Sequence, residues 1–318
     1  MNPSASILTK TKLDFQAPRP QDIQWAEPLL LAADRMGCEF CFGNIYAWSL
    51  RYGTEIARAD GIFFSRSTSV KHGRRAYGMP LGETMSRPEA LRGAVMRLKE
   101  DAARGGTRGG GLHFYGLEAR DVRLLEDAFP GEFAFEPDRD SFDYIYAQSD
   151  LAALAGKKYH SKRNHIARFV KDNADWRYEE ITPGNLEECL AMANRWEALY
   201  TDRDPEGLEQ EARALCRACA HYEAFGMRGG LLRVGGELIA FTLGEPLSRN
   251  TFATHFEKAY PQIPGAYQMI NRCFAEHTLK GFAYINREED LGSDGLRKAK
   301  QSYHPAILLE KYKATEIL

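Results

Sequence analysis

The sequence predicts an α/β (α+β) protein in which two copies of one mixed fold follow each other along the chain. Three observations support this class. The chain has 318 residues, more than one ordinary hydrophobic core accommodates. Helical and strand-like segments alternate, and their order occurs twice: helices, antiparallel strands, a long helix, a strand, a short helix and a closing strand. The glycine pair Gly235–Gly236 lies between two apolar strand-like runs, as in a tight hairpin.

The first half begins with an amphipathic helix. Apolar residues at Ile23, Trp25, Leu29 and Leu30 recur near helical spacing. Further along, runs of strand-forming residues alternate with runs of good helix formers. The expected elements are helices over 22–36, 43–50, 87–104 and 119–129, and strands over 54–66, 74–80 and 112–117, followed by a strand pair over 133–148 that the charged sequence PDRD interrupts.

The second half repeats this order. We expect strands over 176–181, 250–258, 282–287 and 306–312, a hairpin over 229–247, and helices over 183–200, 206–225, 265–280 and 296–303. Gly292-Ser293 ends a strand and offers an N-cap to the last helix, and Pro305 stops that helix. The domains are therefore expected at 1–156 and 176–318, joined by a basic helix over 157–175.

Composition indicates a soluble globular protein. Hydrophobic residues make up 44% of the chain and charged residues 27%. A net charge of -2 argues against a surface built wholly for nucleic acid, although a local basic patch remains compatible with it. Since no apolar run reaches the ~18 residues of a membrane span and no secretion signal precedes the first helix, we expect a cytoplasmic protein.

The cysteines favour free thiols over a metal site. Two of the spacings are C-x-x-C, at Cys38/Cys41 and Cys216/Cys219. Zinc ribbons keep their two cysteine pairs roughly 15–20 residues apart, far closer than these. Cys216 and Cys219 also lie within an expected helix, where they share one face. No metal is therefore expected.

Several motifs resemble a known family. They are CEFCFGNIYAW (38–48), KKYHSKRNHIARF (157–169), HFEKA (255–259), GAYQMIN (265–271) and INREEDLGSDGLRKAKQSYHP (285–305). They are similar to an uncharacterised bacterial family related to the C-terminal aminoacyl-transfer domain of phosphatidylglycerol lysyltransferases, and more distantly to the Fem peptidoglycan aminoacyltransferases. The resemblance implies two tandem GNAT-like domains, each a mixed, mostly antiparallel sheet flanked by helices.

The resemblance also implies an acyl- or aminoacyltransferase with no tightly bound cofactor. Its co-substrate would be acyl-CoA or aminoacyl-tRNA, and its acceptor an amine or hydroxyl, for example on a lipid headgroup or peptide. The donor would lie between the strands over 250–258 and 282–287, with its phosphates at the next helix start, where Gly265, Ala266 and Tyr267 offer backbone N–H groups. The closely spaced glycines of coenzyme A-binding members are absent.

Acyl transfer to an amine needs a base, donors for the oxyanion and a proton source for the leaving group. Alternation along the strand places His255 and Glu257 on one face, and Glu257 is the first choice for the base with His255 the second. Tyr303 matches the position where many GNAT enzymes keep a tyrosine acid.

Binding roles fall on polar residues near these positions. The candidates for phosphate or carboxylate are Lys298 and Lys300, those for substrate are Asn286, Arg287 and Glu288, and those for tRNA, a lipid headgroup or another polyanion are Lys158, Lys162 and Arg163 in the basic helix. Each has a structural alternative: a buried hydrogen bond, a core tyrosine or a solvated charge. The alternative for the whole protein is a GNAT-like protein without catalysis that binds an anionic metabolite, a lipid headgroup or a nucleic acid.

Overall fold

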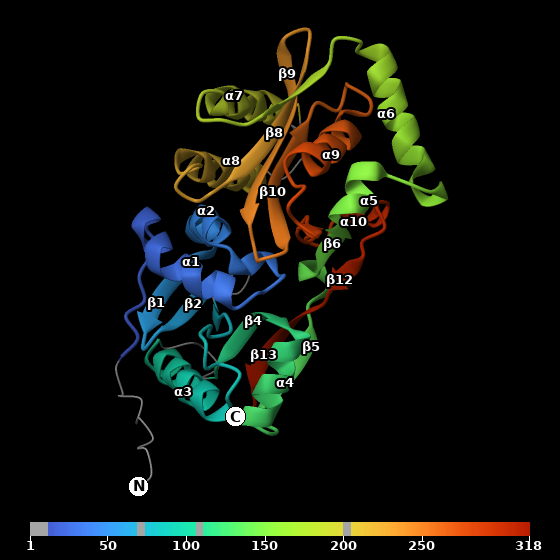
Figure 1. Ribbon diagram of the computed structural model, residues 1–318. Helices are drawn as coiled ribbons and strands as arrows, with labels where there is room; N and C mark the ends of the chain where they lie inside the picture. The colour runs from blue at the N-terminus through green and yellow to red at the C-terminus, as the bar shows by residue number, and fades with distance from the viewer. Residues whose placement is uncertain (1–11, 69–73, 106–110, 200–204) are drawn as a thin grey trace. The chain divides into compact units, whose positions relative to one another are not determined.

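The computed structural model describes residues 12–68, 74–105, 111–199 and 205–318 (Figure 1). The chain divides into two compact units. Unit 1 contains Met1–Ala33, Ser49–Arg139 and Glu310–Leu318, and unit 2 contains Asp34–Trp48 and Asp140–Leu309. Each unit is therefore assembled from segments that are distant in the sequence.

Unit 1 is built on a mixed sheet with the strand order β1-β2-β3-β4-β13-β5. Its strands are β1 (Glu55–Ala59), β2 (Ile62–Thr68), β3 (Arg75–Tyr77), β4 (His113–Glu118), β5 (Phe133–Pro137) and β13 (Lys311–Glu316). Its helices are α1 (Ile23–Ala32), α3 (Pro88–Arg104) and α4 (Ala119–Ala128). Pro88 begins α3, and Leu91, Val95 and Leu98 bury one face of it in the core of the unit.

Unit 2 is built on a second mixed sheet with the order β12-β6-β11-β10-β9-β8-β7. Its strands are β6 (Asp143–Ala147), β7 (Arg177–Glu180), β8 (Arg228–Val234), β9 (Glu237–Pro246), β10 (Thr251–Ala259), β11 (Tyr284–Asn286) and β12 (Ile307–Leu309). Its helices are α5 (Gln148–Ala153), α6 (His160–Asp172), α7 (Leu186–Glu197), α8 (Pro205–Ala220), α9 (Ala266–His277) and α10 (Asp294–Gln301), together with the residues of α2 (Phe42–Tyr52) up to Trp48.

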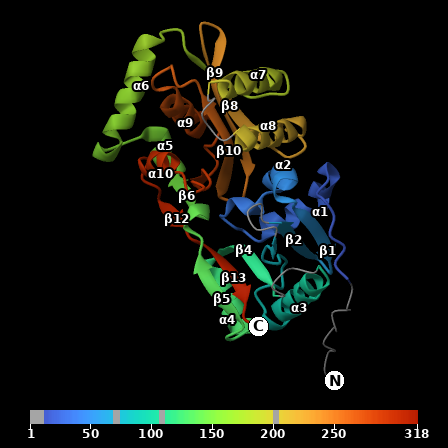
Figure 2. The ribbon, with the colours of Figure 1, turned by 180° about the vertical axis from the view of Figure 1, so that it is seen from behind.

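Helices cover both faces of the sheet in unit 2. Both ribbon views show α7 and α8 on one face and α5 and α9 on the other (Figures 1 and 2). The α9 face holds the main apolar core, to which Phe252, Ile270 and Phe274 contribute. On the other face Trp48 stacks on Phe256 of β10, with ring centroids 6.2 Å apart. The strands in the middle of this sheet are therefore buried on both sides.

The predicted hairpin is confirmed. β8 and β9 pair in antiparallel fashion up to Val234↔Glu237, so that Gly235 and Gly236 form the turn. Both glycines have positive φ, 61° and 83°, which is what a type I′ turn requires. The predicted N-cap of the last helix is also confirmed, because Ser293 Oγ accepts a hydrogen bond from Leu296 N.

The two sheets repeat one feature, a parallel pair joined by a helix. In unit 1 β3 pairs with β4 after α3, and in unit 2 β10 pairs with β11 after α9; the other pairings of the described strands are antiparallel. This confirms the predicted α/β class with two GNAT-like halves.

The halves of the sequence exchange strands, so the two units do not follow the expected limits 1–156, 157–175 and 176–318. The strands expected as a pair over 133–148 both form, but β5 joins the sheet of unit 1 and β6 that of unit 2. The closing strand expected over 306–312 divides at Glu310 into β12 and β13, which also join different sheets. Strand pairing depends on partners far along the chain, which a local pattern does not reveal.

β10 and β11 separate soon after they meet. They pair over three positions only, from Thr251↔Tyr284 to Ala253↔Asn286. β11 then ends at Asn286, whereas β10 continues to Ala259. Beyond this register, contacts between the two segments come from side chains, and the candidate site lies there.

None of the helices in the described parts of the chain is long and apolar enough to cross a membrane.

Candidate active site

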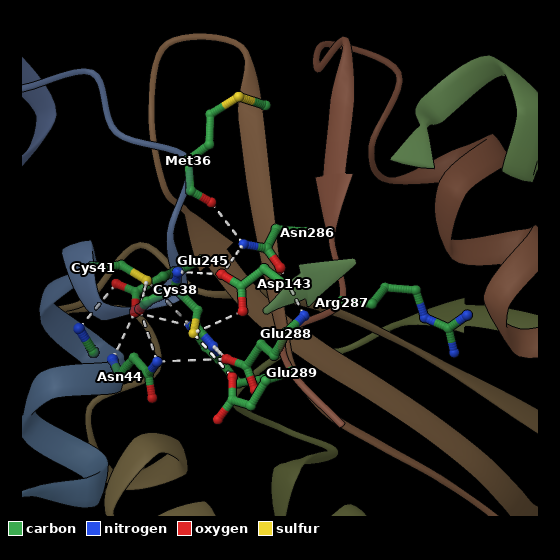
Figure 3. Close-up of polar contacts among 12 residues, drawn as sticks. Met36, Cys38, Cys41, Asn44, Asp143, Glu245, Asn286, Arg287, Glu288 and Glu289 are labelled. Atoms are coloured by element: carbon green, nitrogen blue, oxygen red, sulfur yellow. Dashed lines mark hydrogen bonds and ion pairs between the residues drawn. The ribbon is translucent and has the colours of Figure 1, made fainter. Parts of the chain in front are cut away.

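Two pairs of side chains join β10 to the residues that follow β11. Arg287 Nη2 donates to Glu257 Oε1 at 2.6 Å, and His255 Nδ1 lies 2.7 Å from Glu288 Oε1. Arg287 and Glu288 are consecutive, yet Figure 3 shows Arg287 directed away from the group of residues that Glu288 enters. The site therefore contains two polar clusters.

The prediction that His255 and Glu257 share a face of the strand is wrong. A β-bulge beside His255 shifts the register between β10 and β9, so that simple alternation stops. His255 contacts Glu245 of β9, whereas Glu257 contacts Asn271 of α9. The two predicted bases thus belong to different clusters and cannot act as a pair.

The first cluster, which we call the Glu257 cluster, consists of Glu257, Arg287, Tyr146, Tyr303 and Lys162. The Arg287 guanidinium carbon lies 5.8 Å from the ring centroid of Tyr146 and 5.0 Å from that of Tyr303. Lys162 Nζ lies 4.0 Å from the Tyr303 centroid. With one carboxylate and two cations, the Glu257 cluster offers both a proton acceptor and positive charge for a developing oxyanion.

Buried polar atoms next to Glu257 lack partners. Thr242 lies opposite Glu257 in the β9–β10 register. The hydroxyl oxygen of Thr242, Oδ1 of Asn271 and Nη1 of Arg287 are all buried. None of these three atoms has a hydrogen-bond partner among the described residues. An unmade buried hydrogen bond costs about 1–3 kcal/mol, so three such atoms around one carboxylate indicate a place for polar groups of a ligand.

Burial changes the proton affinities in this cluster. It lowers the pKa of Lys162 to about 8, with a further contribution from the positive charge of Arg287. It raises the pKa of Tyr303 and of Tyr146 well above the usual tyrosine value. Near neutral pH the tyrosines keep their protons, and Lys162 exchanges its proton more readily than an ordinary lysine.

The second cluster, the His255 cluster, consists of Cys41, Glu245, His255 and Glu288. Figure 3 labels Cys41, Glu245 and Glu288 of this cluster. His255 Nε2 lies 3.0 Å from Glu245 Oε1 and 3.9 Å from Cys41 Sγ. Glu245 in turn accepts hydrogen bonds from the backbone N–H groups of Gly43 and Asn44 in the first turn of α2, at 3.0 and 2.8 Å. The carboxylate of a sheet residue therefore caps the start of α2.

His255 has both ring nitrogens engaged. Burial works against a charged imidazole, but Cys41, Glu245 and Glu288 together raise the pKa of His255 well above its ordinary value. Burial also raises the pKa of the Cys41 thiol, so the sulfur keeps its proton. A doubly bonded imidazolium has no lone pair for an acceptor amine, which leaves Glu257 as the stronger candidate for the base.

Asn286, predicted to bind substrate, is fully buried and bonded within the protein. Its Nδ2 donates to Met36 O at 2.7 Å and to Asp143 Oδ2 at 2.8 Å, and its Oδ1 accepts from the backbone N–H of Glu288 at 2.6 Å. Asp143 also accepts from the backbone N–H of Cys38 at 2.8 Å. Asn286 therefore holds the segment around residue 36 against the end of β11.

The predicted phosphate-binding helix start shows a packing role. Gly265 has φ 88°, and a Cβ there would lie 2.3 Å from His165 O, because α6 packs closely on α9. The N–H of Ala266 donates to Ile263 O at 3.2 Å. Tyr267 packs against the apolar core. At this helix start the glycine is explained by the approach of α6.

Of the two predicted anion-binding lysines of α10, one is exposed and one is buried. Lys298 is exposed, whereas Lys300 is 8% exposed. Lys300 Nζ donates to the backbone carbonyls of Arg287, at 2.6 Å, and Glu289. Lys300 thereby holds the loop that carries Arg287 and Glu288.

The three predicted cations of the basic helix have different partners. Lys158 pairs with Asp150 at 3.0 Å, and Arg163 donates to the carbonyls of Leu154 and Gly156 at the end of α5. Lys162 alone reaches the Glu257 cluster.

The two C-x-x-C pairs do not come together as the four ligands of one zinc site among the described residues. All six are free thiols, and Cys216 is exposed. The described residues contain two groups whose possible metal-ligand atoms lie within 4.8 Å of one another: Cys41 with Glu245 and His255, and Cys38 with Asp143 and Glu289. Each C-x-x-C cysteine at 38 and 41 thus joins acidic residues from elsewhere in the chain.

Sequence reasoning missed Glu245, Asn271 and Tyr146. A signal for Glu245 is present in the sequence, because it is a carboxylate that follows the mostly apolar run Leu238–Gly244; in the structure it is only 2% exposed. Asn271 and Tyr146 carried no comparable signal, since a single amide in a helix and a tyrosine in a strand are both ordinary.

The sheets and their helix-linked parallel pairs define a protein of the tandem GNAT-like class. Residues 32–315 match the family model described as phosphatidylglycerol lysyltransferase, C-terminal. The chain belongs to this family.

Similar proteins with known structures or curated sequences carry little functional description. A conserved protein of unknown function from Bacteroides thetaiotaomicron is 38% identical, with a TM-score of 0.89 over 96% of this chain and 100% of that one. The C-terminal domain of a putative lysylphosphatidylglycerol synthetase from Agrobacterium fabrum is 15% identical, with a TM-score of 0.65 over 93% of this chain and 92% of that one, and shares the fold. An uncharacterised protein from Mycoplasmoides gallisepticum is 25% identical over 54% of this chain, and the match spans 55% of that protein's length.

Proposed function

We propose that the protein is an aminoacyltransferase that moves an aminoacyl group from aminoacyl-tRNA onto an amine or hydroxyl acceptor. The observation that carries the proposal is the position of Glu257, which lies in a partly buried polar cluster where β10 and β11 separate. Membership of the phosphatidylglycerol lysyltransferase family supports the acyl-transfer class.

In the proposed reaction the acceptor nitrogen or oxygen attacks the ester carbonyl of the donor. Glu257 takes the proton that the acceptor loses as the new bond forms. Arg287, whose Nη1 is buried without a partner among the described residues, stabilises the oxyanion. The ester C–O bond then breaks, and the ribose oxygen leaves with a proton from Tyr303 or from Lys162, which lies against its ring.

Two observations favour tRNA over coenzyme A as the donor. The start of α9 lacks closely spaced glycines, and the N–H of Ala266 is already bonded to Ile263 O. In addition, Lys157 before α6 and Arg168 and Lys171 on α6 are exposed, Arg168 in an exposed ion pair with Asp172, and exposed cations along one segment suit a phosphate backbone.

The test is a transfer assay with purified protein. Radiolabelled aminoacyl-tRNAs and, in parallel, acetyl-CoA are offered to phosphatidylglycerol vesicles, short peptides and small amines, and products are identified by mass. We expect a product from aminoacyl-tRNA, and Glu257→Gln should lower its rate of formation by about 10²–10⁴-fold. Glu276→Gln, a half-exposed carboxylate on α9, is the matched control and should retain activity. Product formation from acetyl-CoA alone would contradict the tRNA donor, and equal activity of the Glu257 variant would contradict the base.

A second candidate, a binding protein without catalysis, is favoured by one observation. The Glu257 carboxylate is already paired with Arg287, and both ring nitrogens of His255 are engaged, so no base stands free. Saturable binding of a donor without any transfer product would support this candidate.

A further inference from the structure

Three side chains capable of binding a metal ion meet in the His255 cluster, on the opposite side of the sheet from Glu257. Cys41 precedes α2, Glu245 ends β9 and His255 lies at the bulge of β10. Their sulfur, oxygen and nitrogen atoms lie within 4.8 Å of one another, and the cysteine and glutamate are each 2% exposed. Residues separated by more than 200 positions thus place three different ligand types at one point.

We propose that Cys41, Glu245 and His255 bind a divalent transition-metal ion of the zinc class. Zinc takes thiolate, imidazole and carboxylate ligands at about 2.0–2.3 Å, which puts ligand atoms of a tetrahedron roughly 3.3–3.6 Å apart. The distances found here, 3.0 Å from His255 Nε2 to Glu245 Oε1 and 3.9 Å to Cys41 Sγ, lie on either side of that range. A thiolate in the set selects zinc-like ions over magnesium or calcium.

A second, independent observation is the arrangement around these ligands. His255 uses Nδ1 to contact the Glu288 carboxylate at 2.7 Å, which leaves Nε2 directed at the proposed ion. This carboxylate–histidine arrangement is the usual second shell of zinc-bound histidine. Glu245 is likewise fixed, by the N–H groups of Gly43 and Asn44.

Close packing keeps Glu245 in place. A Cβ on Gly43 would lie 2.6 Å from Glu245 Oε1 and 2.7 Å from Met227 Cε, so only glycine lets the carboxylate reach the start of α2. The ligands therefore come from rigid positions on a helix start and two paired strands, as metal sites require.

Electrostatics also favour a cation. Two carboxylates, those of Glu245 and Glu288, face the single imidazole of His255 at 3.0 and 2.7 Å. Metal binding releases the Nε2 proton of His255 and the thiol proton of Cys41, and the ion replaces both. The ion would clamp the Cys41 segment onto β9 and β10, and because Glu257 lies on the other face, it takes no part in the proposed transfer.

The test measures metal in the full-length protein. After incubation with ZnCl2 and gel filtration, elemental analysis should find about one zinc per chain that EDTA removes with a fall in Tm. Replacing zinc by Co²⁺ should produce a thiolate-to-cobalt charge-transfer absorption. Wild-type protein that retains no stoichiometric metal, or a cobalt form without that absorption, would overturn the proposal.

Variants assign the ligands. Cys41→Ala should lose the cobalt charge-transfer band and the bound zinc, whereas Cys189→Ala removes an equally buried thiol of α7 and should keep both. Glu288→Gln should keep the ligands but weaken zinc affinity by about 10–100-fold, as loss of a second-shell partner does. If the folded Cys41 variant binds as much zinc as wild type, the thiolate is not a ligand. If that variant does not fold, the Glu288 variant tests the site instead, and an unchanged zinc affinity of Glu288→Gln would contradict the proposal.

Discussion

The ion pair between Arg287 and Glu257, with 2.6 Å between Nη2 and Oε1, spans the point at which β10 and β11 cease to pair. Each side chain is 13% exposed, so the pair is largely shielded from water. The Glu257 carboxylate is paired with the guanidinium, and it becomes available as a base once a ligand takes over part of the Arg287 hydrogen bonding.

Glu257→Gln should lower transfer activity by about 10²–10⁴-fold, the usual contribution of a general base. The amide retains the size of the side chain but cannot take a proton. Arg287 loses its charged partner, so a decrease in the free energy of unfolding should accompany the loss, measurable by urea denaturation. A double variant, Glu257→Gln with Arg287→Met, removes the unpaired charge and should recover stability but not activity. Recovery of activity in the double variant would argue against the base role.

Lys162 should make stability depend on pH in alkaline solution. Its folded-state pKa is about 8, below the roughly 10.4 of an unfolded lysine. Between these values the unfolded chain binds more protons, so the stability of the wild type rises with pH from about 8 to about 10.4. Below about pH 8 Lys162→Met should have a higher free energy of unfolding than wild type, because it buries no charge. This difference in the free energy of unfolding should shrink as the pH rises through the window. Urea denaturation at several pH values measures it, and Lys171→Met, which removes an exposed charge from the same helix, controls for net charge. A difference that does not change with pH would contradict the lowered pKa.

Gly265→Ala should destabilise the protein by about 1–3 kcal/mol or more, since a non-glycine residue is strained at positive φ. The new Cβ would also lie 2.3 Å from His165 O, so that α6 and α9 have to separate. Gly281→Ala is the control, because nothing lies within 4 Å of a Cβ at that position. The comparison is by thermal unfolding, and equal Tm values for the two variants would show that α6 does not approach as closely as described.

Asn286→Ala should destabilise unit 2 without a direct effect on catalysis. The change leaves Met36 O, one Asp143 oxygen and the Glu288 N–H without their amide partner in a buried region, at about 1–3 kcal/mol each for groups that find no water. Asn164→Ala, at an exposed position of α6, should be nearly neutral. The transfer rate per folded molecule distinguishes the two roles, because a substrate-binding Asn286 would raise KM in the fraction that remains folded.

The exposed cations of the basic segment should control binding of tRNA. Replacing Lys157, Arg168 and Lys171 with alanine removes three positive charges. If all three contact phosphates, the slope of log K against log salt should fall by roughly 2–3, at about 0.7–0.9 per contact. Fluorescence anisotropy with labelled tRNA measures it. Affinity that is unchanged at every salt concentration would place the tRNA elsewhere.

Much of the secondary structure and part of the candidate site can be predicted from the local sequence. The Gly235–Gly236 turn and the Ser293 cap were predictable, because both depend on residues within a few positions of each other. Glu257 and Arg287 are both candidates from the sequence, and the structure places them in the same cluster. The basic segment makes Lys162 a candidate for binding, but no local pattern predicts its contact with the Tyr303 ring.

What the sequence by itself determined is the set of helices and strands, the mixed α/β class and the two-fold repetition, since periodicity and capping act over short distances. Only the tertiary structure decided that β6 and β13 exchange between the sheets, that a bulge separates His255 from Glu257, and that Glu245 meets Cys41 at the start of α2. These features depend on pairing and burial between residues more than 200 positions apart, and no local pattern encodes which distant partner a strand or a buried charge will find.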